Sequence, residues 1–158
     1  MVFIVCLQKN IKGASIKINK DHEEIALKSK NPRYCYIYAT TAPDPNTKAL
    51  EEIVLESKDP DCCYKFARFI SGANIKAHEK IVLKSKNVQH CCNFAKHVPE
   101  ADIKTHEKIV LESKNPEYCY KFALNIKDAN IKAHEQVILE SKNKKALFSF
   151  ALLIKKIK

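Results

Sequence analysis

The sequence repeats itself with a period of 28 residues. The segment 74–101 returns as 102–129 and again from residue 130 onward, and two segments upstream fit the same template. Such a period is typical of solenoids, in which each unit buries its apolar face against its neighbours. We therefore expect a single repeat domain over residues 1–158. Its units are 18–45, 46–73, 74–101, 102–129 and 130–158, preceded by a half repeat and connection over 1–17.

Each unit carries the pattern of two short helices. In unit 102–129, Asp102 is a good N-cap for a first helix, because its side chain can accept a free backbone N–H of the first turn. Asn115 followed by Pro116 is a strong start signal for a second helix. We therefore expect an all-α fold, an α-solenoid of about five αα-hairpins plus an N-terminal half repeat, with about eleven helices. Residues at helical spacing follow both starts, namely Ile103, His106, Ile109 and Val110, then Cys119, Phe122, Ala123 and Ile126.

The net charge of +10 is concentrated at the two ends of the chain. Of the 28 basic residues, four lie in residues 1–20 and six in residues 141–158, and neither segment contains an acid. The remaining 18 basic residues equal the 18 acids in number. A positive groove for nucleic acid should be a basic stripe along the whole array, so this distribution weakens that interpretation. The basic C-terminal end comprises Lys144, Lys145, Lys155, Lys156 and Lys158.

Five columns of the first helix are identical in all five units: two of lysine and one each of glutamate, leucine and serine. On a helical wheel the lysines, glutamates and leucines fall within an arc of about 80°. This arrangement predicts a charged strip along the array that could face a ligand. In the alternative interpretation, Lys104 pairs with Glu107 on its own helix, while Lys114 caps the helix C-terminus and reaches a glutamate of the next unit. The candidate strip comprises Lys20, Glu23, Lys30, Lys48, Glu51, Lys58, Lys76, Glu79, Lys86, Lys104, Glu107, Lys114, Lys132, Glu135 and Lys142.

Histidine and cysteine columns suggest metal or proton chemistry at first sight. However, Leu50 fills the histidine position in the second unit and Leu147 fills the cysteine position in the last, which indicates packing roles in the core. Cys62 and the Cys and His residues of segment 90–97 could form a zinc site, but the CxxC pair of such sites is absent. We expect no metal and no cofactor. The columns are His22, His78, His106 and His134, and Cys35, Cys63, Cys91 and Cys119.

Aromatic side chains on the second helix could stack on nucleic-acid bases, but their positions at the edge of the apolar face favour packing between units. The chain has no Gly-rich phosphate loop, Ser-His-Asp spacing or isolated carboxylate pair, and the serine column, Ser29 to Ser141, favours a tight turn between helices. We expect that the protein is not an enzyme.

The compartment can be predicted from the cysteines and the N-terminus. Seven cysteines are an odd number, and the apolar run Val2–Leu7 is too short for a signal-peptide core or a membrane span. We therefore expect reduced thiols, a cytoplasmic location and no membrane partner.

The unit has a specific motif over most of the chain. The strings ANIKAHE (73–79) and LESKNPEYCYKFA (111–123) resemble short tandem repeats of uncharacterised bacteriophage and bacterial proteins, with His where Leu is more usual before the glutamate. In architecture alone the array is similar to HEAT-type helical repeats, some of which bind DNA. The resemblance implies a phage or mobile-element origin and therefore the cytoplasm of a bacterial host.

Two functions follow as expectations. The first is a non-enzymatic module for protein–protein interaction, which in a phage setting would inhibit a host factor such as a defence nuclease. The apolar last helix, 147–157, could serve the same partner or a dimer. The alternative is sequence-independent nucleic-acid binding through lysine ladders, which should weaken steeply with salt.

Overall fold

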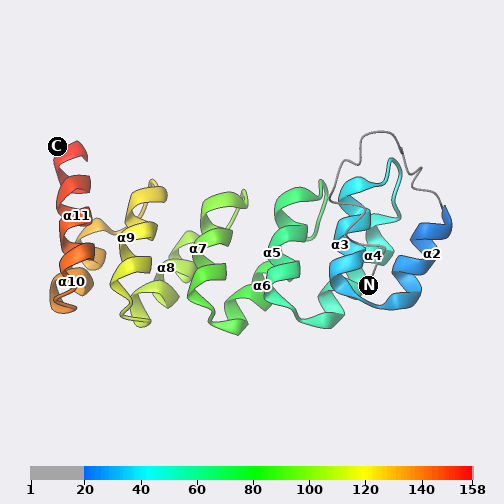
Figure 1. Cartoon of the computed structure of the whole chain (residues 1–158), viewed down its shortest axis with the longest axis horizontal. Coiled ribbons are helices and arrows are strands. Elements are labelled where there is room, and N and C mark those ends of the chain that lie inside the picture. The colour runs from blue at the N-terminus through cyan, green and yellow to red at the C-terminus, as the bar shows by residue number, and fades with distance from the viewer. Residues whose placement is uncertain (1–19, 158) are drawn as a thin grey trace.

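The computed structural model describes residues 20–157, without the side chains of Lys20, Lys156 and Ile157, and this part of the chain forms ten α-helices and no strand. The helices follow one another as a linear array of hairpins, with α2 and α11 at opposite ends (Figure 1). The expected all-α repeat solenoid is therefore confirmed. The expected lone helix over residues 1–12 lies outside the described residues. The helices are α2 (Lys20–Ser29), α3 (Pro32–Thr41), α4 (Thr47–Ser57), α5 (Pro60–Phe69), α6 (Ile75–Ser85), α7 (Val88–His97), α8 (Ile103–Glu112), α9 (Pro116–Asn125), α10 (Ile131–Glu140) and α11 (Lys144–Ile157).

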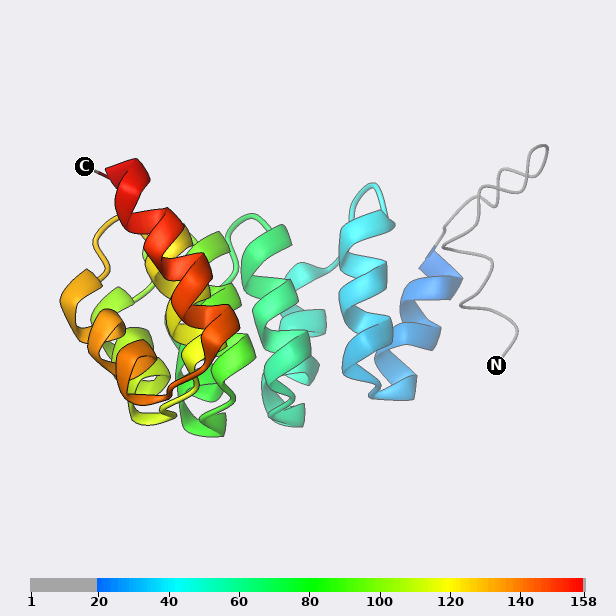
Figure 2. The ribbon, with the colours of Figure 1, turned by 60° about the vertical axis from the view of Figure 1, so that its left-hand side comes forward.

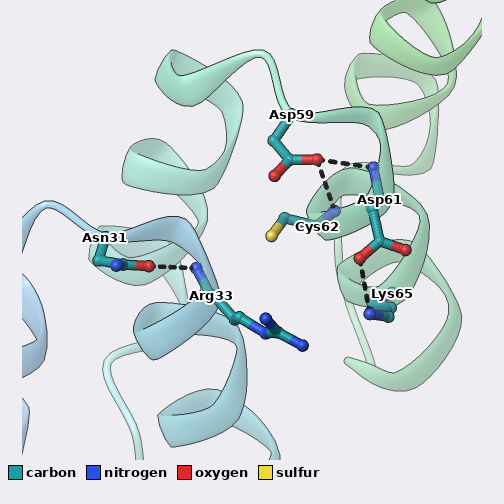
Figure 3. Close-up of polar contacts among 6 residues, drawn as sticks. All are labelled: Asn31, Arg33, Asp59, Asp61, Cys62 and Lys65. Carbon is teal, nitrogen blue, oxygen red and sulfur yellow. Dashed lines mark hydrogen bonds and ion pairs between the residues drawn. The ribbon is translucent and has the colours of Figure 1, made fainter. Parts of the chain in front are cut away.

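The helices begin where the caps predict. Asp59 Oδ1 accepts from the backbone N–H groups of Asp61 and Cys62, at 2.9 and 3.3 Å, and Asn31 Oδ1 accepts from Arg33 N–H at 3.0 Å (Figure 3). Asp61, in the first turn of α5, also forms an ion pair with Nζ of Lys65, one turn further along the helix, at 2.6 Å. Such caps satisfy backbone donors that have no partner inside the helix. The first helices of units two to five are capped in the same way by Asn46, Asn74, Asp102 and Asn130.

The serine column joins the two helices of each hairpin. Ser113 Oγ donates to the carbonyl of Val110 at 2.6 Å and accepts from Asn115 N–H at 3.2 Å. One hydroxyl thus ends the first helix and positions the cap of the second. The prediction of a tight turn is confirmed in all five hairpins, since Ser29, Ser57, Ser85 and Ser141 make the same two bonds.

The second lysine column lies at a left-handed backbone position. Lys114 has φ of 52°, and its N–H donates to the carbonyl of Leu111 at 3.1 Å. Helices often end in this conformation, but glycine or asparagine usually supplies it, because a Cβ costs free energy there. These lysines therefore end the helix through their left-handed backbone conformation. The same positive φ, between 48° and 55°, occurs at Lys30, Lys58, Lys86 and Lys142.

Replacing Lys114 by glycine should raise the free energy of unfolding by about 0.5–1 kcal/mol, because it relieves the left-handed strain. Lys108 is the matched control, since it is an exposed lysine inside α8. Its replacement by glycine should lower the same quantity by about 1 kcal/mol. Urea denaturation of both variants checks the prediction, and equal losses would contradict it.

The helices form two rows. The second helices of the hairpins, α3, α5, α7, α9 and α11, stand side by side in what we call the helix-B row, and α2, α4, α6, α8 and α10 form the helix-A row (Figures 1 and 2). The core lies between the rows and between successive units, where Phe66, Phe94 and Phe122 are almost fully buried. Burial of one such ring contributes roughly 1.5–3 kcal/mol, so each unit is stabilised chiefly by its neighbours.

Candidate functional site

The glutamate column forms hydrogen bonds between successive units. Oε1 of Glu79, on α6, accepts from the backbone N–H of Asp102 at 2.7 Å and from Nε2 of His106 at 3.1 Å. One carboxylate thus holds both the N-cap residue and the first turn of α8. The same pair of bonds joins Glu51 to Asn74 and His78, and Glu107 to Asn130 and His134. We call these contacts the glutamate–histidine ladder.

The histidines of the ladder are core residues, as the sequence predicts. His106 has no exposed surface, and its ring stacks on Phe94 with centroids 5.2 Å apart. Its Nδ1 is buried without a hydrogen-bond partner, so the ring donates through Nε2 and keeps the lone pair on Nδ1. Burial lowers the pKa of His106 and outweighs the opposing effect of Glu79. A neutral imidazole inside the protein is therefore a structural donor.

The second unit shows that the ladder does not need every histidine. Leu50 is fully buried at the histidine position of α4, and among the described residues Glu23 then accepts a hydrogen bond only from the backbone N–H of Asn46. In residues 20–157, no three His, Cys, Asp or Glu side chains are grouped so that they could hold a metal ion. The ladder is thus a set of structural hydrogen bonds between successive units.

The structure separates the glutamates of the predicted charged strip from its lysines. The carboxylates of Glu51, Glu79 and Glu107 lie in the interfaces between units, where their side chains are only 16, 11 and 13% exposed. Among the described residues, these glutamates accept hydrogen bonds from histidine and form no ion pair with lysine. The structure therefore corrects the alternative interpretation of Lys104–Glu107 pairs. Glu23 and Glu135 are half-buried, whereas the described lysines of both columns are exposed: Lys30, Lys48, Lys58, Lys76, Lys86, Lys104, Lys114, Lys132 and Lys142.

Sequence reasoning missed the partnership of the two columns because a helical wheel treats each helix by itself. Histidine at one position and glutamate at the next lie about 100° apart on their own helix. The stacking of units brings the glutamate of one helix to the histidine of the following one, 27 residues later. The one available signal is that both columns recur with the same period.

The cysteine column packs in the core. Cys119 has no exposed surface, and its Sγ lies 3.9 Å from the carbonyl oxygen of Val110. Burial raises the pKa of the Cys119 thiol to about 11 and that of Cys63 to about 12. These thiols stay protonated near neutral pH, and a protonated thiol is a poor nucleophile and a poor metal ligand.

Positive charge is unevenly distributed along the helix-A row. Unit 74–101 contains five lysines and two acids, and one of these acids is the buried Glu79. The exposed charged residues of α6 are therefore all lysines, with Lys76, Lys80 and Lys84 at successive turns. The balance of charge over residues 21–140 conceals this local excess.

The helix-B row exposes large apolar side chains. Leu124 of α9 and Leu152 of α11 occupy the same template position and are 48 and 47% exposed, and Phe69 of α5, one position further on, is 52% exposed. Phe148 of α11 is 69% exposed. In the basic C-terminal end, Lys144, Lys145 and Lys155 are exposed, the side chain of Lys156 is not described, and Lys158 lies outside the described residues.

The fold and these surfaces define the chain as an α-helical repeat solenoid. Comparisons with protein-family models, curated proteins and solved structures find no match. Within residues 20–157, no helix is both long and apolar enough to span a bilayer.

Proposed function

We propose that the protein is a non-enzymatic scaffold that binds a protein partner through its helix-B row. The observation that carries this proposal is the exposure of Phe69, Leu124 and Leu152 on that row. These side chains occupy neighbouring template positions on α5, α9 and α11, and α7 carries Lys96 and His97 at the same positions. Exposed apolar side chains bordered by polar ones are suited to a protein interface. Solenoids commonly present such extended surfaces to partners.

One cleft of the helix-B row is consistent with the proposed non-enzymatic role. A cleft of about 430 Å³ between α7 and α9 is lined by Cys92, His97 and Tyr118 among other residues. Burial raises the pKa of the Cys92 thiol to about 12, so no thiolate is present at neutral pH. The ring of Tyr118 instead packs beneath Lys121 Nζ, 5.1 Å from its centroid. The cleft thus lacks an activated nucleophile.

The resemblance to phage repeats extends the proposal to the partner. A small scaffold of this origin would act by covering a surface of a host factor, such as a defence nuclease, in the bacterial cytoplasm. Binding alone is sufficient for such inhibition.

Replacing Leu124 and Leu152 by serine should abolish recovery of a partner that the wild-type protein captures from bacterial lysate. Leu139 gives the matched control, because it is 59% exposed but lies on α10 of the helix-A row. The Leu139→Ser variant should recover the partner as the wild type does. Quantitative mass spectrometry of the captured proteins is the measurement. Recovery that is equal for all three proteins would refute a helix-B interface.

Nucleic-acid binding is the second candidate function, favoured by the lysines on the outer face of α6. Phosphate binding by lysine needs no base contacts and depends strongly on salt. However, exposed acids occur on the neighbouring helices, with Glu52 and Glu56 on α4 and Glu112 on α8. These carboxylates would repel a phosphate backbone that ran along the array, which places this candidate second.

A further inference from the structure

A groove of about 380 Å³ lies between α4 and α6 on the helix-A row. Leu55 and Ile81 supply half-buried apolar surface to it, and Lys58, Lys80 and Lys84 are exposed around them. Ser85 completes the lining. The α4–α6 groove therefore combines an apolar patch with three positive charges and no carboxylate.

The repeat provides an internal comparison, because the same template positions recur between each pair of neighbouring A helices. The leucine, the serine and a β-branched residue are kept at every junction, so the grooves differ mainly at the three charged positions. Only the α4–α6 groove, among those of the described residues, has lysine at all three. The corresponding residues are Lys30, Glu52 and Glu56 between α2 and α4, Lys86, Lys108 and Glu112 between α6 and α8, and Lys114, Gln136 and Glu140 between α8 and α10.

The lysines of this groove are not paired with a counter-charge from the described residues. In the part of the chain that the structure describes, no carboxylate lies within ion-pair distance of Lys58, Lys80 or Lys84. In the next helix, by contrast, Lys108 pairs with Glu112 at 3.9 Å. Like charges four residues apart on one helix repel each other, so the pair Lys80 and Lys84 opposes folding slightly. An anionic ligand would remove this repulsion.

We propose that the α4–α6 groove binds an acidic peptide segment of a protein partner, with one apolar side chain of the peptide between Leu55 and Ile81. This inference rests on the proposed function as a protein-binding scaffold. Acidic residues on both sides of the apolar side chain complement Lys58, Lys80 and Lys84, and charge complementarity of this kind selects the partner and speeds its association. The groove, of about 380 Å³, is large enough to admit a large aliphatic or aromatic side chain.

The chemistry of the groove favours a peptide over a nucleic acid. Its lining contains no aromatic ring on which a base could stack and no arginine, whose planar guanidinium binds phosphate bidentately. The positive site is also confined to one groove, because Glu56 lies on one side of it and Glu112 on the other. A nucleic-acid strand needs a longer basic track.

Fluorescence anisotropy titration at low salt tests the proposal with a short labelled peptide that carries one leucine between runs of glutamate. The full chain should bind this peptide. Replacing the peptide leucine by serine should weaken binding about tenfold or more, because the free energy gained by burying the leucine side chain is lost. Replacing Lys80 and Lys84 by glutamate should also weaken binding about tenfold or more. This variant reproduces the acids that α4 carries at the same positions, Glu52 and Glu56, so the fold accommodates them.

Lys108→Glu is the matched control, because it alters the same template position in the next groove and should leave the affinity within about twofold. Equal affinity of the wild type and the Lys80→Glu, Lys84→Glu variant for the peptide would overturn the proposal. The proposal would also be overturned if the wild type bound a labelled oligonucleotide more tightly than the peptide and the Lys80→Glu, Lys84→Glu variant no longer bound that oligonucleotide. Capture of a partner from lysate separates this proposal from the proposed function. If only the groove proposal is wrong, the wild-type protein still recovers a partner through Leu124 and Leu152. If the proposed scaffold function is wrong, the wild-type protein recovers no partner.

Discussion

Replacing Glu79 by alanine should lower the free energy of unfolding by about 2–4 kcal/mol. The carboxylate accepts two hydrogen bonds, from Asp102 N–H and from Nε2 of His106. The imidazole is fully buried, so its donor would lose its partner in a place that water does not reach. An unsatisfied buried donor costs about 1–3 kcal/mol, and a lost backbone hydrogen bond adds about 1 kcal/mol. A change of tautomer cannot compensate, because Nδ1 has no partner either.

Glu23→Ala is the matched control. Within residues 20–157, Glu23 accepts only from the backbone N–H of Asn46, and Leu50 takes the place of the histidine. Its loss should cost no more than about 1 kcal/mol, because Asn46 is exposed and water can solvate the freed N–H. Urea denaturation followed by circular dichroism measures both values. Adding His106→Leu to Glu79→Ala should recover part of the loss, as Leu50 fills this position naturally. Equal effects of the two glutamate substitutions would show that the histidine bond contributes nothing.

Acidification should destabilise the protein steeply below about pH 6.5, the unperturbed histidine pKa. Burial lowers the pKa of His78, His106 and His134 below the value of 6.5 that holds for the unfolded chain. Below that pH the unfolded state binds more protons than the folded state, so stability falls as pH falls and is unaffected by these groups above it. Each histidine can contribute about 1.4 kcal/mol per pH unit, so three can contribute about 4 kcal/mol per unit.

Urea denaturation at a series of pH values from 8 to 5 checks this result. In a variant with leucine at positions 78, 106 and 134, most of the slope should disappear, and a smaller slope from His97 should remain. The pKa of His97 is also lowered, by burial and by the nearby charges of Arg68 and Lys96. A wild-type stability that stays constant between pH 7.5 and 5.5 would contradict the neutral, buried state of the three histidines.

Local signals in the sequence predicted the hairpins well. Asn115 and Pro116 mark the start of α9, and Ser113 marks the turn before it, because caps and turns depend on hydrogen bonds between residues two to four apart. The core position of His78, His106 and His134 and of the cysteine column also followed from substitution within the repeat, since Leu50 and Leu147 occupy the same columns. His22 of the same column is only half-buried. Such inferences need no knowledge of how one unit sits on the next.

The candidate sites depended more on tertiary structure. Helix periodicity places Glu79 beside lysines on its own helix, but the neighbouring unit approaches it with His106 and the cap of α8. The left-handed conformation of Lys114 is likewise set by the chain reversal that α9 requires, and no residue preference of lysine predicts it. The charge distribution along the sequence did not predict the α4–α6 groove, because Lys58 and Lys80 belong to different units and lie close together only when those units stack.

The class of fold follows from the amino-acid sequence alone, because a 28-residue period with caps, turns and apolar spacing is a set of local constraints repeated along the chain. Tertiary structure decided which columns face one another. The translation and rotation from one unit to the next turn glutamates into internal acceptors and leave lysines outside. The same stacking places three lysines of two units around one apolar groove. Both the glutamate–histidine contacts and this groove depend on how helices of different units pack against each other.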